Sequence, residues 1–214
     1  MKRVNTIALL LVFVIIQSSY AQVNKLTARQ ILDKTSVTIR KAMPFQISFV
    51  ASQYKGNLQT TKFSGTFYTK GKMYYLKSSQ YQIWFDGTTQ WTYVPSNNEV
   101  NVSSSNGLQT QRFNPYHFIN LYKDGYSYAL SSEKESGIDC YSIRLLAKKG
   151  QAIKEMFLKV NKKTFLPISV KFRQGTENWT RINISSLKAN QKLSNAFFSF
   201  PKKKFPNVEI VDLR

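Results

Sequence analysis

The sequence predicts an α+β protein that is mainly β, built on one curved antiparallel sheet, or incomplete barrel, with helices over its concave side. Over most of the chain, apolar and polar residues alternate with a period of two, as they do in half-buried strands. Turn dipeptides such as Lys149-Gly150 and Gln174-Gly175 separate these runs, which indicates hairpins in sequence order. A meander this long must curl to cover its apolar face, and two helical segments are available to pack against it.

The chain begins with a segment typical of a secretory signal peptide. A charged start, Lys2-Arg3, precedes an apolar run over residues 7–16, and a small-x-small cleavage site ends at Ala21. Because the apolar run is short and no second one follows, no membrane anchor is expected. Residue 22 is glutamine rather than cysteine, so the cut end would carry no lipid. We expect a soluble exported protein that forms a single domain over residues 22–214.

The first element of the mature chain is predicted to be a helix. Thr27 and Gln30 have the spacing of a capping box, and apolar residues such as Ile31 and Leu32 recur at intervals of three and four. Pro44 ends the helix because a proline cannot continue it.

Strands are predicted from the alternation that follows, in two groups. The first group is centred on Phe45/Ile47/Phe49/Ala51, Phe63/Gly65/Phe67, Tyr81/Ile83/Phe85, Trp91/Tyr93 and Val100/Val102. The second group is centred on Tyr126/Tyr128/Leu130, Tyr141/Ile143/Leu145, Ile153/Met156/Leu158/Val160, Ile168/Val170/Phe172 and Trp179/Arg181/Ile182/Ile184.

A short amphipathic helix is predicted between the two groups. Asn114-Pro115 supplies a cap and a first-turn proline, and Asp124-Gly125 supplies a stop. Apolar residues lie between them at helical spacing, Phe118 and Leu121 among them.

The formal net charge is +20, and loss of Lys2 and Arg3 with the leader lowers it to +18. In an exported protein nucleic acid is largely out of reach, so no nucleic-acid partner is expected. The remaining polyanions are lipid head groups, lipopolysaccharide and acidic proteins. A charge that serves only solubility is the alternative interpretation.

Residues for catalysis are scarce. The single histidine, His117, lies in an aromatic cluster, and the single cysteine, Cys140, has a strand context typical of core packing. The sequence has no Gly-rich phosphate loop, no His-x-x-x-His pair and no Cys-x-x-Cys pair, so neither a cofactor nor a metal is expected. A paired-carboxylate glycosidase site stays open, but the scattered acidic residues do not favour one. The sequence therefore favours a protein that is not an enzyme.

Aromatic residues make up 14% of the chain and concentrate in the predicted strands and the central helix. They can simply fill the core, because aromatic side chains bury the most area per residue. Alternatively, they line a site for an apolar ligand inside the curved sheet.

Several motifs resemble one known family. Ser-Gly-Thr-Phe at residues 64–67, Asp-Gly-Thr-Thr-Gln-Trp-Thr-Tyr at 86–93 and Asn-Pro at 114–115 occur in the order found in the periplasmic outer-membrane lipoprotein carrier family, the LolA type. Phe-Phe-Ser-Phe-Pro at 197–201 and Val-Glu-Ile-Val-Asp at 208–212 are similar to the end of that family's sequences. The resemblance therefore covers nearly the whole mature chain.

The resemblance implies an unclosed antiparallel β-barrel with an α-helical lid across its mouth. It also implies a chaperone in the periplasm that catalyses no reaction. Such a protein takes lipidated proteins from an inner-membrane lipoprotein-releasing transporter, shields their acyl chains and delivers them to an outer-membrane acceptor. Nothing in the chain demands a dimer, so a monomer is expected.

Acyl chains need such shielding because each buried methylene contributes about 0.8 kcal/mol. We expect the lining of the acyl-binding site to come mainly from aromatic residues of the first strand group. The expected lining residues are Phe45, Ile47, Phe49, Phe63, Phe67, Tyr75, Trp84, Trp91, Tyr93, Phe118 and Leu121. The expected lid contacts are Ile31, Leu32, Phe118 and Leu121.

The chain departs from the family at one position of the lid mechanism. Many members have an Arg-Pro pair after the glycine strand, and the arginine holds the lid shut. Here the sequence has Lys70 with no arginine or proline nearby. Lys70 is the candidate substitute, although an ammonium group lacks the planar donor fork of guanidinium.

Two further functions fit the same sequence. One is an envelope sensor with a similar cup-shaped fold. The other is a polyanion-binding or lipid-binding module that uses the basic surface, with Lys202-Lys203-Lys204 as its strongest local feature. Salt separates the last possibility from acyl-chain carriage, because ionic strength weakens electrostatic binding.

Overall fold

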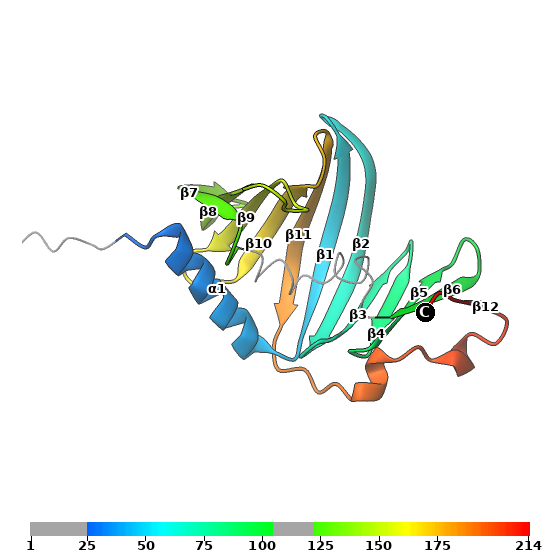
Figure 1. Cartoon of the computed structure of the whole chain (residues 1–214). Helices are drawn as coiled ribbons and strands as arrows, with labels where there is room; N and C mark the ends of the chain where they lie inside the picture. The colour runs from blue at the N-terminus through cyan, green and yellow to red at the C-terminus, as the bar shows by residue number, and fades with distance from the viewer. Residues whose placement is uncertain (1–24, 105–121) are drawn as a thin grey trace, which may run out of the picture.

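The computed structural model describes residues 25–104 and 122–214. One 12-stranded sheet runs through both ranges, in the order β12-β6-β5-β4-β3-β2-β1-β11-β10-β9-β8-β7. All neighbouring strands are antiparallel except β12 and β6, which are parallel. The sheet is strongly curved and its two edges do not meet, so the predicted fold class is confirmed (Figure 1).

The elements have the following bounds. The helix is α1 (Ala28–Ala42), and the strands before the undescribed segment are β1 (Phe45–Lys55), β2 (Leu58–Lys70), β3 (Met73–Ser78), β4 (Gln82–Phe85), β5 (Thr89–Val94) and β6 (Glu99–Ser104). After it come β7 (Tyr126–Glu135), β8 (Ile138–Ala147), β9 (Glu155–Asn161), β10 (Pro167–Arg173), β11 (Asn178–Lys188), the 3-10 turns η1 (Asn195–Phe198) and η2 (Lys202–Lys204), and β12 (Glu209–Asp212).

Helix α1 begins where its capping box predicts. The Thr27 hydroxyl accepts a hydrogen bond from the Gln30 amide, and the Gln30 side chain accepts one from the Thr27 amide. The predicted central helix, with Phe118 and Leu121, lies outside the described residues, as does the predicted signal peptide.

The core lies on the concave face of the sheet, where α1 packs against both halves. Ile31 and Leu32 belong to an apolar cluster with residues of β8 and β9. Ile39, two turns further along the helix, belongs to a second cluster with residues of β1, β2 and β3. Helix α1 therefore bridges the two halves of the curved sheet (Figure 1).

The convex face is covered in part by the C-terminal strap, which we define as residues 189–208 between β11 and β12. The strap runs below the sheet from the end of β11 to β12, which pairs with β6 (Figure 1). Phe197 packs on Tyr68 and Tyr75, and Phe200 and Phe205 pack on Trp84, with ring centroids 5.0–5.9 Å apart. The strap thus gives this half of the sheet a second apolar layer.

Candidate functional site

A cavity of about 310 Å³ lies between α1 and the concave face of the sheet. Helix α1 and strands β1, β2, β3, β9, β10 and β11 all contribute to its wall. Most of the wall is aromatic or aliphatic. The lining residues are Leu32, Thr35, Ile39, Phe45, Ile47, Phe49, Ala51, Gln53, Phe63, Phe67, Leu76, Tyr81, Met156, Leu158, Pro167, Val170, Phe172, Gln174, Thr180, Ile182, Ile184 and Leu187.

Five of the expected lining residues lie together in this wall. Phe45, Ile47, Phe49, Phe63 and Phe67 all border the cavity.

Of the two expected lid contacts that the structure describes, one borders the cavity and the other does not. Leu32 borders the cavity, whereas Ile31 is buried beside it in the core of the β8–β9 half. Phe118 and Leu121 lie outside the described residues.

Four expected lining residues lie on the convex face instead, which corrects their placement. Tyr75, Trp84 and Trp91 stand side by side across β3, β4 and β5, and Tyr93 follows Trp91 on the same face. The register explains why: Phe67 faces the cavity opposite Leu76, so the adjacent Tyr75 must point outward. The strap, not a ligand, covers Tyr75, Trp84 and Tyr93.

Sequence reasoning missed the opposite wall of the cavity. Strands β9, β10 and β11 supply apolar lining residues that include Leu158, Val170, Ile182 and Ile184. Their alternation predicts strands, but the face they present depends on the pairing of β1 with β11, which joins distant parts of the chain.

The polar lining residues are unevenly placed. Gln53 and Gln174 are exposed, and Thr180 is half-buried opposite Gln53 in the β1–β11 pair. They mark a polar mouth at the ends of these strands. Thr35 lies on the helix and is buried. An amphipathic ligand could therefore keep its polar group at the mouth and its apolar part inside.

A row of aromatic rings forms one side of the wall. Phe49 meets Phe63 edge-on at 6.3 Å between ring centroids, and Phe63 meets Tyr81 at 5.8 Å. Burial raises the pKa of Tyr81 to about 12, so its hydroxyl stays neutral at ordinary pH. These three aromatic side chains therefore bring no charge to the cavity wall.

Gly65 is required by the close approach of the Lys77 backbone oxygen and the Phe49 ring. A Cβ at this position would lie 2.6 Å from the Lys77 backbone oxygen and 2.8 Å from a Phe49 ring carbon. We therefore expect Gly65→Ala to lower the free energy of unfolding by about 1–3 kcal/mol, measured by urea denaturation. Gly175→Ala is the matched control, because nothing lies within 4 Å of its Cβ position. Equal stability of the two variants would contradict this role of Gly65.

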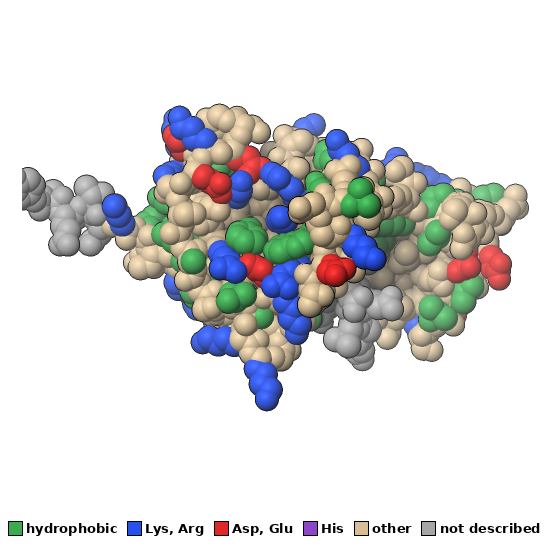
Figure 2. Space-filling view, turned by 90° about the horizontal axis from the view of Figure 1, so that it is seen from above, with side chains coloured by type: hydrophobic (Ala, Val, Ile, Leu, Met, Phe, Trp, Pro, Cys, Tyr) green, Lys and Arg blue, Asp and Glu red, His purple; other side chains and the backbone are tan. Residues whose placement is uncertain are grey.

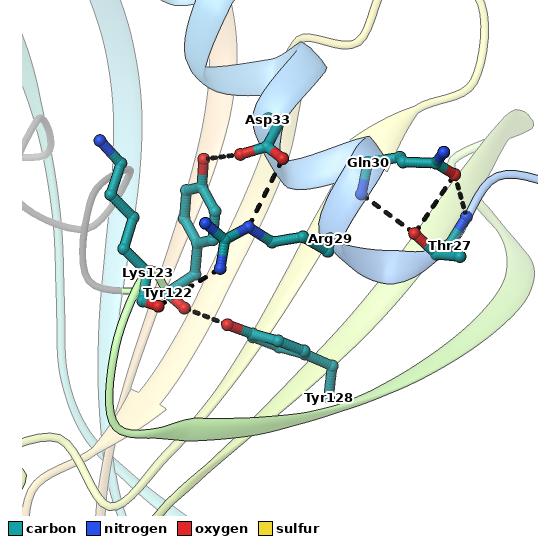
Figure 3. A network of polar contacts seen from close by, with 7 residues as sticks. All are labelled: Thr27, Arg29, Gln30, Asp33, Tyr122, Lys123 and Tyr128. Carbon is teal, nitrogen blue, oxygen red and sulfur yellow. Dashed lines mark hydrogen bonds and ion pairs between the residues drawn. The ribbon is translucent and has the colours of Figure 1, made fainter.

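A polar network fixes the first half of α1 to the chain that leads into β7 (Figure 3). The Tyr122 hydroxyl donates to Asp33 Oδ1 at 2.5 Å, and Arg29 forms an ion pair with Asp33 at 3.4 Å. Arg29 also donates to the Lys123 carbonyl and lies over the Tyr122 ring. The Tyr128 hydroxyl donates to the Tyr122 carbonyl. We call α1 the lid, and we call the five residues Arg29, Asp33, Tyr122, Lys123 and Tyr128 the lid latch.

The latch predicts a dependence on alkaline pH. Burial, followed by the bond to Asp33, raises the pKa of Tyr122 from 10.0 to about 12. A group whose pKa rises on folding stabilises the fold fully below its unfolded pKa, and this contribution is lost as the pH rises through the folded value. We expect Tyr122→Phe to speed amide exchange in α1 at pH 7 and to reduce, by the share of Tyr122, the loss of stability between pH 10 and about 12, where buried tyrosines such as Tyr81 also titrate. If amide exchange in α1 were the same in Tyr122→Phe as in the wild-type protein, the Tyr122 bond would not hold the helix in place.

Lys70 contacts the C-terminal strap rather than the helix. Its Nζ donates to the Leu193 carbonyl at 2.9 Å. Two backbone bonds beside it, from Asn190 to the Ala42 carbonyl and from Gln191 to the Pro44 carbonyl, join the strap to the end of α1. Lys70 is thus connected to the lid only through the strap.

Basic side chains are spread over the surface, with fewer acidic side chains among them (Figure 2). On the convex face of the β9–β11 half, Lys171 lies 4.5 Å above the Trp179 ring. Glu155 is buried between Arg144 and Arg173. Burial alone would raise the pKa of Glu155, but the bonds from Arg173 and Arg144 outweigh it and lower that pKa.

In residues 25–104 and 122–214, no group of three or more His, Cys, Asp or Glu residues could hold a metal ion. Within the same two ranges, no helix has the length and apolar character needed to cross a membrane.

A family model described as outer membrane lipoprotein carrier protein LolA matches residues 17–176. The matched range includes the helix and the strands up to β10, and it excludes β11 and the strap. The sequence matches no curated protein.

Solved structures with similar folds include three with low sequence identity. A DUF1329 family protein from Desulfovibrio piger is 19% identical, with 80% of this chain and 96% of that chain covered and a TM-score of 0.45. A LolA superfamily protein from Nitrosomonas europaea is 16% identical, with 82% and 98% covered and a TM-score of 0.41. MucB of Pseudomonas aeruginosa, in complex with MucA, is 12% identical, with 81% and 60% covered and a TM-score of 0.41.

Proposed function

The chain belongs to the outer membrane lipoprotein carrier family, and from this premise we propose that it is a periplasmic chaperone that shields the acyl chains of lipidated proteins. The acyl chains lie in the cavity under α1, and the protein part of the cargo stays outside the mouth. The chaperone acts as a monomer and catalyses no reaction.

The observation that carries this proposal is the apolar wall of the cavity and its position beneath a helix. An acyl chain gains about 0.8 kcal/mol for each methylene removed from water, so a few methylenes suffice for a useful affinity. Phe49, Phe63 and Phe67 border the cavity and can change rotamer to refill space when the ligand leaves. Moderate affinity suits a carrier, which must release its cargo as well as bind it.

The route of the cargo follows from the same premise. An inner-membrane lipoprotein-releasing transporter would supply the lipidated protein, and an outer-membrane acceptor would receive it. The lid latch and the strap contact at Lys70 give the chain two places at which a partner could open the cavity without touching the ligand.

Native mass spectrometry of the purified mature protein tests the proposal. We expect lipid or lipidated protein to remain bound when the salt concentration is raised before the sample is transferred to volatile buffer. The matched control is the variant Ala51→Trp, described below, which should be recovered without such a ligand. An empty wild-type cavity that also fails to take up an added synthetic lipopeptide would overturn the proposal.

The basic surface supports a second candidate, a module that binds anionic envelope polymers. Lys202, Lys203 and Lys204 are exposed on η2 beside the aromatic residues of the strap. Electrostatic binding weakens steeply with ionic strength, whereas acyl-chain binding does not. Retention of lipopolysaccharide in low salt only, with no acyl-dependent binding in high salt, would favour this candidate or a sensor that reads such polymers.

A further inference from the structure

Helix α1 presents one hydroxyl to the cavity. Leu32, Thr35 and Ile39 follow one another at helical spacing and all border the cavity. Leu32 and Ile39 make the apolar contacts that a lid requires. Thr35 stands between them with a polar atom in an otherwise apolar stripe.

Thr35 is fully buried, with 2% of its surface exposed. Within the described residues its Oγ1 has no hydrogen-bond partner. A helical threonine usually satisfies its hydroxyl on the carbonyl one turn earlier, and Thr35 does not. A buried hydroxyl left unpaired is unfavourable, so its position against a cavity calls for a partner inside that cavity.

The other amide and hydroxyl side chains of the wall differ from Thr35. Gln53 and Gln174 are exposed at the mouth, where water can satisfy them, and Thr180 is half-buried beside them. Tyr81, whose hydroxyl also belongs to the wall, is only half-buried. Because no described residue takes the Thr35 hydrogen bond, this hydroxyl is available to a ligand inside the cavity.

We propose that Thr35 Oγ1 donates a hydrogen bond to the carbonyl oxygen of an acyl ester or acyl amide bound in the cavity. This inference rests on the proposed function and adds a chemical preference to it. The cavity favours acyl chains with their carbonyl group over plain alkyl chains of the same length. The bond also fixes the position of the acyl chain along the cavity wall, because the methylenes are all alike and would fit equally well at several positions.

Ester and ether lipids of equal chain length test the preference. The probes are a synthetic dipalmitoylglyceryl-cysteine peptide and dipalmitoyl phosphatidylglycerol, each with its dialkyl ether counterpart, and affinity is measured by displacement of a bound fluorescent fatty acid. One neutral hydrogen bond predicts that the wild-type protein binds the ester about 3- to 10-fold more tightly than the ether. A larger ratio for the peptide pair than for the phospholipid pair would assign the carbonyl to lipidated proteins, and the reverse would assign it to phospholipids.

Substitutions at Thr35 isolate the hydroxyl. Thr35→Val keeps the branched shape and should bring the ester-to-ether ratio to about one, while the empty protein unfolds at the same or a higher urea concentration. Thr35→Ser should keep the preference. Ser36→Ala, which removes a buried hydroxyl from the next position, is the matched control because Ser36 does not border the cavity.

The outcomes separate the two proposals. An ester preference that survives in Thr35→Val would overturn the role of Thr35, and so would equal wild-type binding of ester and ether. If the wild-type protein binds neither lipid, the proposed function itself fails.

Discussion

Ala51→Trp is expected to weaken binding of a lipopeptide by roughly 100-fold and to leave the fold intact. Ala51 is buried in the middle of β1 and borders the cavity, opposite Phe63 on one side and Ile182 on the other. An indole there would occupy the space of several methylenes. Loss of about four methylenes at about 0.8 kcal/mol each corresponds to about 3 kcal/mol.

The adjacent face supplies the control for this variant. Ser64 follows Phe63 on β2, so its exposed side chain points away from the cavity. Ser64→Trp adds the same side chain to the same strand pair and should bind the lipopeptide as the wild-type protein does. Binding would be measured by titration of a fluorescent lipopeptide. Equal weakening by both substitutions would mean that the ligand does not lie in the cavity.

Trp84→Ala is expected to lower the free energy of unfolding by about 3–5 kcal/mol, the cost of removing a large buried ring. Trp84 is 3% exposed and is enclosed by Tyr75 on the sheet and by Phe200 and Phe205 of the strap. Its loss should also free the strap, since two of the strap's aromatic contacts end on it. Urea denaturation measures the first effect, and amide exchange in residues 195–205 measures the second.

Phe67→Ala is the comparison that separates stability from binding. Phe67 is also fully buried, but it borders the cavity. Both variants should be destabilised, and only Phe67→Ala should change the affinity for a lipopeptide under conditions in which both remain folded. If Trp84→Ala lost as much affinity for the lipopeptide as Phe67→Ala, Trp84 would belong to the binding site after all.

The parts of the fold that rest on local signals could be predicted from the sequence. The capping box at Thr27 and the proline after Met43 set the ends of α1, and the structure has the helix at Ala28–Ala42. Strands with one apolar face, such as β1, follow from their alternation. Signals of this kind depend only on neighbouring residues.

Strand β3 could not be predicted in the same way. The first four residues of its sequence, Met73–Ser78, show no alternation, because Tyr75 is half-buried on one face while Tyr74 and Leu76 are buried on the other. Tyr74 and Leu76 face the concave side, and Tyr75 faces the strap. A strand with apolar or aromatic residues on both faces loses the period-two signal. Without β3, the face of each following aromatic residue cannot be counted along the sheet.

The same limit applies to the site. The choice of Trp84 and Tyr93 as lining residues follows from their size and apolar character, which a buried convex face satisfies as well as a cavity does. Only the path of the strap, more than 100 residues further along the chain, decides between the two. Lys70 shows the same dependence, because its partner Leu193 is 123 residues away.

The central claim is that an acyl chain lies inside the cavity, and isotope-filtered NMR tests it most directly. The mature protein, with ¹³C-labelled isoleucine methyl groups, would be mixed with an unlabelled palmitoyl lipopeptide. The account predicts nuclear Overhauser contacts from the acyl methylenes to Ile47, Ile182 and Ile184. Contacts confined to the exposed Ile138 and Ile210 would contradict it.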